Sequence, residues 1–446
     1  MKILAPHKLR PEHWFLLLFI PLSLLMMIAL PIFRAPDEQV HLEQIYTLAT
    51  GQWVSSMQTH QALLPEQLCQ IENAQSITHK QVMQMLQSTT PDNMVVSPVN
   101  SASAIYPPLS YLPQVLGMKL MMLLSNNQVL FWYGARLGNW ICVVLLLYFA
   151  IRLIPCCKYI MLAFTLLPLN LQQMISASAD GITTALVYLQ IAFLLHSIYR
   201  KPLFRLREHL LLLLLCIGLA SWKICYYPFA LLLLLIPQQC FISRHSRALS
   251  IGTSLLIPVL MTILWGCVCY TSLFMNPIDG STAQTMHGLG ALLQNPFSFF
   301  QRLLASLTTS GPAYIARIFC YSNSLSWFNV DAGFILPTIS VFLTISIFLV
   351  DNSCPLDLRS RSMLIITSII CTLLIFLMLH VWFTPVDHYR IEGFQARYLL
   401  PLLTPVSAAV HPGKKRISLK LLPWLTAGSV FVSLSIICIV FRSTLA

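Results

Sequence analysis

The stretch that decides the fold is WFLLLFIPLSLLMMIALPIF, residues 14–33, which is followed at once by RAPDEQVH, residues 34–41. A helix needs about 20 apolar residues to cross a bilayer, and this run supplies them. The run is longer than the apolar core of a typical signal peptide, and no convincing cleavage site follows it. We therefore expect a retained first membrane span with two carboxylates, Asp37 and Glu38, directly after it.

The composition of the whole chain agrees with this reading. Of the 446 residues, 57% are hydrophobic and only 9% are charged, whereas soluble proteins carry about 25% charged residues. This excludes a soluble protein, a disordered chain and a disulfide scaffold. We predict one all-α multipass membrane domain over residues 1–446 with about 11 transmembrane helices. They are expected at 14–33, 129–151, 159–177, 181–199, 209–222, 224–237, 250–273, 333–350, 362–383, 397–411 and 421–441.

The basic residues predict the orientation. The chain has 27 Lys and Arg against 15 Asp and Glu, a net charge of +12. Most of the basic residues fall in short loops on the side of the N-terminus, which is the cytoplasmic side by the positive-inside rule. This explains the charge better than nucleic-acid binding does, and no nucleic-acid partner is expected. We expect a protein of the inner (cytoplasmic) membrane with a cytoplasmic N-terminus and an outer C-terminus.

Two long outer segments are predicted, at 34–128 and 274–332. In the first, Pro36 and the two acids predict a juxtamembrane helix that ends near Gly51. A small polar cap should follow, with a short helix near 78–88, and then a short interfacial helix at 109–124. Cys69 and Cys320 lie in these segments, where a disulfide between them could form.

Asp37 and Glu38 are the first candidates for catalysis. A carboxylate at the membrane interface can act as a general base or bind a metal ion. Acids in a first helical turn also commonly serve only as helix caps. His41 follows Asp37 by four residues and therefore shares its helix face.

Three further charged residues lie next to apolar segments on the predicted outer side. Asp180 either caps the following helix or serves a site. Lys223, among aromatic residues, either meets a lipid-linked phosphate or reaches toward the interface. Arg397, with Gln395 and Tyr398 beside it, either binds phosphate through its fork or anchors a span.

The motifs occur together in a known pattern. FRAPDEQVH at 33–41, followed by GQW at 51–53, resembles the start of the bacterial membrane proteins catalogued as domain of unknown function 2142. Three further blocks resemble theirs in the same order: YPPLSYLPQ at 106–114, SASAD at 176–180 and QARYLLP at 395–401. The four blocks cover most of the chain.

That family is similar to the GT-C glycosyltransferases, which use polyprenyl-phosphate sugars. The resemblance implies that an acid in the first outer loop, here Asp37 with Glu38 beside it, is the catalytic base or a metal site. Arg397 and Lys223 would hold the donor phosphate, while His41 and Asp180 would orient the acceptor or the base. The partners implied are a polyprenyl-phosphate-linked sugar, the lipid bilayer and a glycan, lipid or protein acceptor of the cell envelope.

Alternative functions stay open at this point. A transporter or flippase for a lipid-linked saccharide would need polar groups near the bilayer midplane, and the predicted spans have few. A non-catalytic envelope assembly protein would not need the acid pair. A divalent cation is one option for a cofactor, although the sequence offers no second obvious ligand for Asp37.

Overall fold

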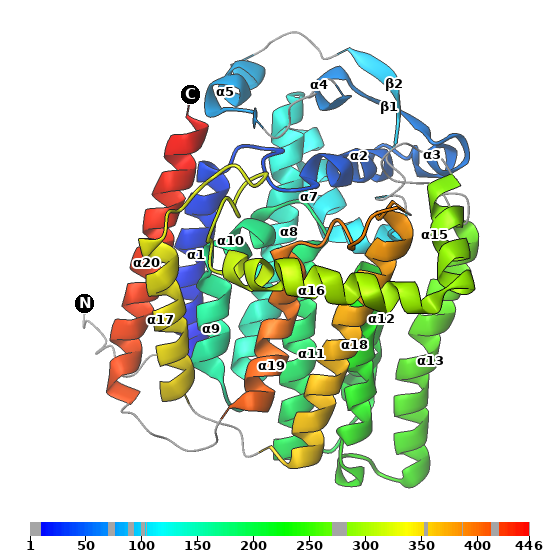
Figure 1. Ribbon diagram of the computed structural model, residues 1–446, viewed down its shortest axis with the longest axis vertical. Coiled ribbons are helices and arrows are strands. Elements are labelled where there is room, and N and C mark those ends of the chain that lie inside the picture. The colour runs from blue at the N-terminus through cyan, green and yellow to red at the C-terminus, as the bar shows by residue number, and fades with distance from the viewer. Residues whose placement is uncertain are drawn as a thin grey trace.

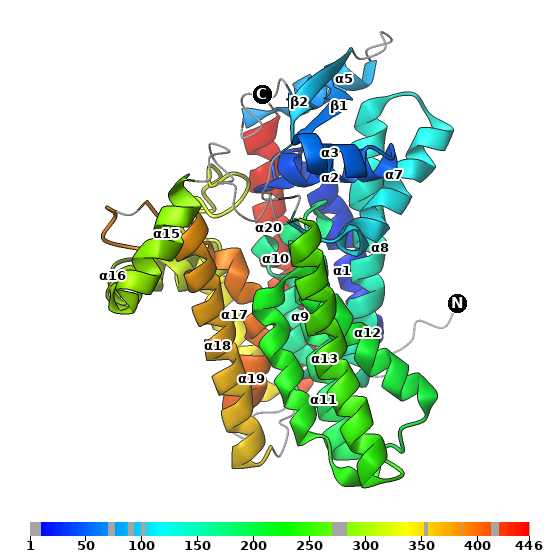
Figure 2. The same cartoon turned by 90° about the vertical axis from the view of Figure 1, so that its right-hand side faces the viewer.

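The computed structural model describes residues 10–69, 76–87, 93–99, 103, 105–269, 283–351, 356–385, 387–411 and 419–445. Its body is a bundle of upright helices, with a smaller part built across one end (Figures 1 and 2). The bundle comprises α1 (Pro11–Ala29), α8 (Gln128–Leu153), α9 (Lys158–Leu166), α10 (Pro168–Ile175), α11 (Asp180–Arg200), α12 (Leu206–Trp222), η4 (Ile224–Leu235), α13 (Arg244–Val268), α17 (Ile335–Val350), α18 (Leu358–Trp382), η6 (Ala396–Leu402), α19 (Leu403–Val410) and α20 (Leu422–Thr444). Two short 3-10 turns, η5 (Gln238–Cys240) and η7 (Leu419–Leu421), connect bundle helices.

Each of the 11 predicted apolar segments contains a helix, but only six described helices are long and apolar enough to span a membrane: α1, α8, α11, α13, α18 and α20. Prolines explain some of the shorter ones. Pro168 separates α9 from α10, Pro228 lies inside the 3-10 helix η4, and Pro401 lies inside η6. Proline lacks the N–H that an α-helix needs. The helical membrane fold is therefore confirmed, and the count of 11 spans stays a prediction.

The segment between α1 and α8 covers one end of the bundle. It comprises α2 (Glu38–Ala49), α3 (Trp53–Thr59), β1 (Gln61–Pro65), α4 (Glu66–Cys69), α5 (His79–Gln87), β2 (Met94–Pro98), η3 (Pro108–Tyr111) and α7 (Leu112–Leu124). The helix predicted to end near Gly51 is α2, which lies across the bundle end (Figure 1). The short cap helix near 78–88 is α5, and η3 with α7 forms the predicted 109–124 helix.

The fold is not purely helical. Strands β1 and β2 pair antiparallel, with Gln61 opposite Pro98 and Pro65 opposite Met94. The short helix predicted for this cap is present as α5, but the strand pair was not predicted. Strands of five residues are too short to give a clear alternating pattern.

The second long segment wraps around the side of the bundle. Helix α15 (Ala283–Gln294) is followed by α16 (Pro296–Ile318), which runs across the upright helices (Figure 1). The chain then returns to the end of α1, where Trp327 Nε1 donates to Phe33 O at 2.9 Å. Residues 274–282 of the predicted 274–332 segment lie outside the described residues. Cys320 is a buried free cysteine, so the Cys69–Cys320 disulfide does not form.

Helices α7 and α8 pack closely through glycines. A Cβ built on Gly138 would lie 2.0 Å from Pro113 O, and one on Gly117 would lie 2.1 Å from Gly134 O. Real side chains cannot approach that closely, so glycine is required at this contact. The close packing fixes η3 and α7, and with them Tyr111, against the bundle.

A fully buried ion pair joins α1, α2 and α8. Arg136 on α8 donates to Glu38 through Nε at 2.8 Å and through Nη2 at 2.6 Å. It also donates to Leu30 O and Pro31 O at the end of α1. The backbone N–H groups of Phe33 and Ala177 donate to the same carboxylate. Both side chains are 0% exposed, and together these bonds set the turn from α1 into α2.

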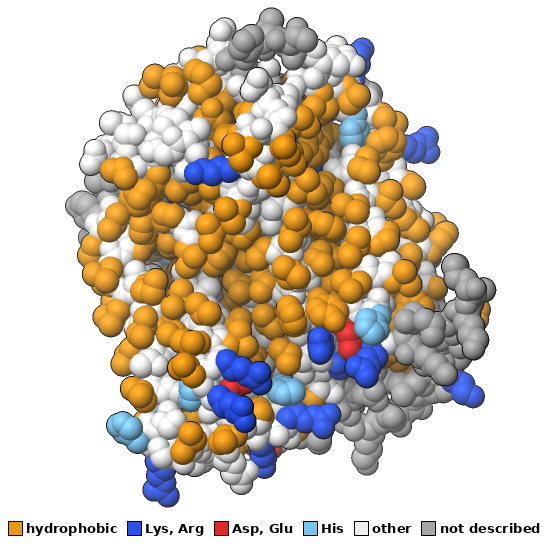
Figure 3. All heavy atoms as spheres, turned by 180° about the vertical axis from the view of Figure 1, so that it is seen from behind, with side chains coloured by type: hydrophobic (Ala, Val, Ile, Leu, Met, Phe, Trp, Pro, Cys, Tyr) orange, Lys and Arg blue, Asp and Glu red, His pale blue; other side chains and the backbone are white. Residues whose placement is uncertain are grey.

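The two ends of the bundle differ in charge. Thr444, at the end of α20, donates to Ala29 O at the end of α1, so the C-terminal end of α20 lies at the α2 end of the bundle. Lys and Arg gather mainly at the opposite end, below a broad hydrophobic band (Figure 3). Residues at helix ends there include Arg152, Lys158, Arg200 and Arg244.

Candidate functional site

The site is built around Asp37, the residue just before α2. Asp37 has a left-handed backbone conformation, with φ of 63°, which aspartate tolerates better than most residues. This turn sends Asp37 and Glu38 in different directions. The Asp37 side chain remains 41% exposed, while Glu38 is fully buried against Arg136. Asp37 is therefore the carboxylate that a substrate can reach.

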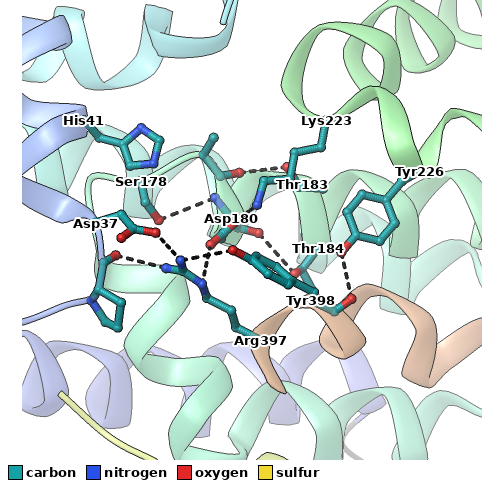
Figure 4. Close-up of polar contacts among 12 residues, drawn as sticks. Asp37, His41, Ser178, Asp180, Thr183, Thr184, Lys223, Tyr226, Arg397 and Tyr398 are labelled. Carbon is teal, nitrogen blue, oxygen red and sulfur yellow. Dashed lines mark hydrogen bonds and ion pairs between the residues drawn. The ribbon is translucent and has the colours of Figure 1, made fainter. Parts of the chain in front are cut away.

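Arg397 connects Asp37 to the rest of the cluster (Figure 4). It lies in the first turn of η6, and its side chain is 3% exposed. Its Nη2 forms an ion pair with Asp37, and its Nη1 donates to Pro36 O at 3.0 Å. Its Nε lies 3.3 Å from Asp180 Oδ2. The guanidinium thus lies between two carboxylates from distant parts of the chain.

Asp180 and Lys223 form the second ion pair of the cluster. Asp180 begins α11, and its N–H donates to Ser178 Oγ at 3.4 Å. Lys223 lies at the junction of α12 and η4. A Cβ on Gly181 would lie 2.6 Å from Gln173 O, so glycine allows the start of α11 to pack against α10. This contact holds Asp180 at its place in the cluster.

The ring of Tyr398 lies beside both cations. Lys223 Nζ lies 4.8 Å from the centre of the Tyr398 ring, and Arg397 Cζ lies 5.3 Å from it. Such distances allow cation–π attraction. The hydroxyl of Tyr226 donates to Tyr398 O at 2.7 Å and fixes the start of η6. Both cations therefore contact the Tyr398 ring as well as carboxylates.

His41 lies on α2 beside the charged cluster. Its Nδ1 is 2.7 Å from the hydroxyl of Tyr111, and its ring is in edge contact with Tyr106. Burial lowers the pKa of His41 to about 4, with the nearby Asp37 and Asp180 opposing the shift. Burial also raises the pKa of Tyr106 to about 12. His41 is therefore neutral at pH 7 and can serve as a hydrogen-bonding group.

The cluster joins two carboxylates, two cations and a neutral imidazole, and the charged side chains sum to zero. A phosphate could bind the cations, and the exposed Asp37 carboxylate could accept a proton. Among the described residues, no group of three or more His, Cys, Asp or Glu side chains could hold a metal ion. The positive charge at this site comes from Lys223 and Arg397.

A narrow cleft with a volume of about 10 Å³, room for about one water molecule, adjoins the cluster. Gln395 and Arg397 line it on one side, and Gln172 and Gln173 of α10 line it as well. Gln173 is 1% exposed, and neither of its amide atoms has a hydrogen-bond partner among the described residues. A buried unpaired polar group costs about 1–3 kcal/mol. Gln395 thus lies in this cleft and not in the charged cluster.

The structure brings together most of the predicted site residues: Asp37, His41, Asp180, Lys223, Arg397 and Tyr398. Gln395, which lines the neighbouring cleft, and Glu38 are the exceptions. Glu38 lies apart from the cluster. Both of its oxygens are fully engaged with Arg136 and backbone N–H groups, out of contact with solvent. This geometry argues against the catalytic role that the sequence suggested for Glu38 and indicates a structural one.

Several residues in and around the site were not predicted from the sequence. Arg136 is an ionisable residue inside the predicted 129–151 span, and such residues usually have a buried partner. Gln172 and Gln173 are adjacent amides inside the predicted 159–177 span. In each case a polar side chain in an apolar segment was the available signal.

Fold and site together define a multipass membrane protein with a charged cluster at one end of its helical bundle. The family model described as predicted membrane protein (DUF2142) matches residues 19–406, and the chain belongs to this family. The resemblance seen in the four sequence blocks is thereby confirmed. Comparisons with curated proteins and with solved structures find no match. The family description states no activity, so function has to be argued from the site.

Proposed function

We propose that this protein is an inverting glycosyltransferase that moves a sugar from a polyprenyl-phosphate donor to a cell-envelope acceptor. The observation that carries the proposal is the exposed Asp37 carboxylate beside two cations that are nearly buried. One group can take a proton, and the others can hold a phosphate. The similarity of the family to GT-C enzymes, which use an acid after the first span, supports the same reading.

The proposed reaction uses Asp37 as the base and the two cations as the phosphate site. The acceptor hydroxyl attacks the anomeric carbon of the donor, and its proton passes to Asp37. The bond between that carbon and the phosphate oxygen breaks, and the lipid phosphate leaves with the electron pair. Lys223 and Arg397 stabilise the developing charge on the phosphate. General-base help is worth about 10²–10⁴-fold in rate.

Donor binding would also prepare the base. The phosphate competes with Asp37 for the fork of Arg397, which forms an ion pair with Asp37 in the structure. When Arg397 turns to the phosphate, the Asp37 carboxylate is released from its ion pair and can contact the acceptor hydroxyl.

The proposal includes an orientation. Lys and Arg gather mainly at the end of the bundle opposite α2 (Figure 3), and the positive-inside rule assigns that end to the cytoplasm. Asp37 would then face the outside of the cytoplasmic membrane. Exposed apolar side chains on the upright helices, such as Leu145 of α8 and Leu264 of α13, offer a surface for lipid and for the donor's tail.

The test is turnover of lipid-linked sugars in membranes that contain matched amounts of wild type, Asp37→Asn or Asp331→Asn. Asparagine keeps the shape of Asp37 and tolerates its backbone conformation, but it cannot accept the proton. We expect wild type to consume a polyprenyl-phosphate sugar and Asp37→Asn to be slower by about 10²–10⁴-fold.

Asp331→Asn is the matched control. Asp331 is exposed in the loop after α16 and accepts a hydrogen bond from Gly333 N at 2.9 Å. Its replacement should leave turnover unchanged. Full activity of Asp37→Asn would remove Asp37 from the mechanism. If wild type consumes no donor but speeds the crossing of a lipid-linked saccharide, the protein is a transporter.

A further inference from the structure

Helix α16 is long enough to cross a membrane but lies across the bundle. It has 23 residues, and about 20 apolar residues suffice for a span, yet it is not among the six candidate spans of the described chain. It runs across the upright helices and lies at the side of the bundle (Figures 1 and 2). The two faces of the helix explain this position.

The inner face of α16 packs against the chain that leads into the charged cluster. Ser306 is buried on this face, and its Oγ accepts a hydrogen bond from Ile391 N at 2.8 Å. The ring centre of Tyr314 lies 4.7 Å from that of Phe394. Ile391 and Phe394 belong to the segment that precedes η6, which carries Arg397. Helix α16 therefore supports this segment.

A second face of α16 is apolar and exposed. Gln301, Thr308 and Thr309 are exposed beside it, so only one side of the exposed surface is apolar. The spacing of the large apolar side chains places them along one side of a helix. These side chains, called the α16 stripe below, are 43–68% exposed: Phe297, Phe300, Leu304, Leu307 and Ile315.

The contacts of α16 place it at the level where an upright helix ends. The ring centre of Phe299 lies 5.6 Å from that of His380, which is in the last turn of α18. Nearer its other end, α18 exposes Ile366 and Ile369, as expected of a helix in lipid. The α16 stripe therefore lies at the border of the apolar surface of a membrane span.

A helix with one apolar and one polar face is suited to the plane of the bilayer interface, where Phe and Leu enter the acyl region. We propose that α16 lies in this interface at the α2 end of the bundle, with the α16 stripe among the lipid acyl chains. The bilayer thereby supports the segment that carries Arg397. That this is the outer leaflet, and that Arg397 binds a donor, rest on the proposed function; the insertion of α16 does not.

Quenching by brominated lipid measures the insertion. Leu304→Trp adds a fluorophore to the α16 stripe, and Thr309→Trp, the matched control, adds one to the polar side of the same helix. The full chain is placed in nanodiscs of phosphatidylcholine with or without bromine on the acyl chains. The signal of the nine native tryptophans, measured in wild type, is subtracted. We expect bromine to remove about half or more of the signal added by Leu304→Trp and little of that added by Thr309→Trp.

Hydrogen exchange measures the support of the segment. Phe300→Gln combined with Leu304→Gln makes the middle of the stripe polar and weakens its insertion. We expect exchange at the Ile391 amide, which donates to α16, to become about tenfold faster in nanodiscs. Thr308→Gln combined with Thr309→Gln is the control on the same helix, and it should exchange as wild type does.

Each outcome decides one part of the proposal. Equal quenching of the two added tryptophans, or no quenching of either, would overturn the insertion; two chains in each nanodisc would then show that a second copy covers the stripe. Unchanged exchange at Ile391 in the Phe300→Gln, Leu304→Gln protein would overturn the support of the segment. If α16 inserts but no donor is consumed, the interfacial helix stands and the transferase fails. Donor turnover without quenching gives the reverse.

Discussion

Asp37 and Glu38 are neighbours in the chain but belong to two different charged sites. Glu38 forms an ion pair with Arg136 in which both side chains are 0% exposed, and Arg136 also donates to the backbone carbonyl of Leu30. Asp37 is 41% exposed and shares Arg397 with Asp180. Exposure to solvent, more than residue type, therefore separates Glu38, which stabilises the fold, from Asp37, which can take part in chemistry.

The largest effect is expected when the charge of Glu38 is removed. Glu38→Gln keeps the shape of the side chain but leaves the Arg136 charge buried without a counterion. Removing one partner of a buried pair costs about 3–5 kcal/mol. We expect a large drop in the unfolding midpoint in mild detergent, whereas Asp37→Asn should melt close to wild type.

A double replacement tests the reason for the drop. Apolar residues of similar volume often replace a buried ion pair without loss of stability. We therefore expect Glu38→Met combined with Arg136→Leu to recover much of the stability that Glu38→Gln loses. A double variant less stable than Glu38→Gln would mean that the backbone contacts of Arg136, and not its charge, hold the turn.

A weaker effect is expected at Arg397, the cation that pairs with both Asp37 and Asp180. Arg397→Lys keeps the charge but loses the fork that contacts Asp37 and Pro36 O together. A hydrogen bond to a charged group is worth about 1.5–3 kcal/mol. We expect KM for the donor to rise by about 10–100-fold, measured by turnover in membranes, with a smaller change in kcat.

Arg390→Lys provides the matched control for this variant. Arg390 lies seven positions before Arg397 in the sequence, is half exposed and pairs with Glu392 at 2.8 Å. Exposed pairs contribute little, so its replacement should leave KM unchanged. An Arg397→Lys protein with unaltered KM would show that the donor phosphate does not use the fork.

Much of the charged cluster could be predicted because each member lies at the end of an apolar segment. Asp37 follows the first segment, Asp180 precedes another, and Lys223 and Arg397 lie at the borders of two more. An alternating topology brings these ends to the same side of the bundle. The prediction that these residues share one side of the membrane therefore agrees with the cluster seen at one end of the bundle.

The remaining features depend on backbone geometry that sequence periodicity does not reveal. The left-handed conformation of Asp37 decides that Asp37 and not Glu38 reaches solvent. Pro168 breaks the predicted 159–177 span, and the amides of the cleft follow the break. The short β1–β2 pair gave no clear pattern. Each difference comes from a local turn that tertiary contacts stabilise.

The smallest effect is expected at His41, which is buried but lies beside the exposed Asp37. Burial lowers the pKa of His41 from 6.5 to about 4. The unfolded chain therefore takes up the proton first as the pH falls. The contribution of neutral His41 to stability is complete above about pH 6.5 and is lost progressively as the pH falls toward 4.

His41→Gln isolates this contribution, because glutamine can still hydrogen-bond Tyr111 but does not titrate. The other ionisable groups are the same in both proteins, so their effects cancel in the difference. We expect the melting temperature of wild type to fall relative to His41→Gln by about 2–4 °C between pH 7 and pH 5, measured in mild detergent. A constant difference across this range would show that His41 titrates as it does in the unfolded chain, and the imidazole would then be exposed to water beside Asp37.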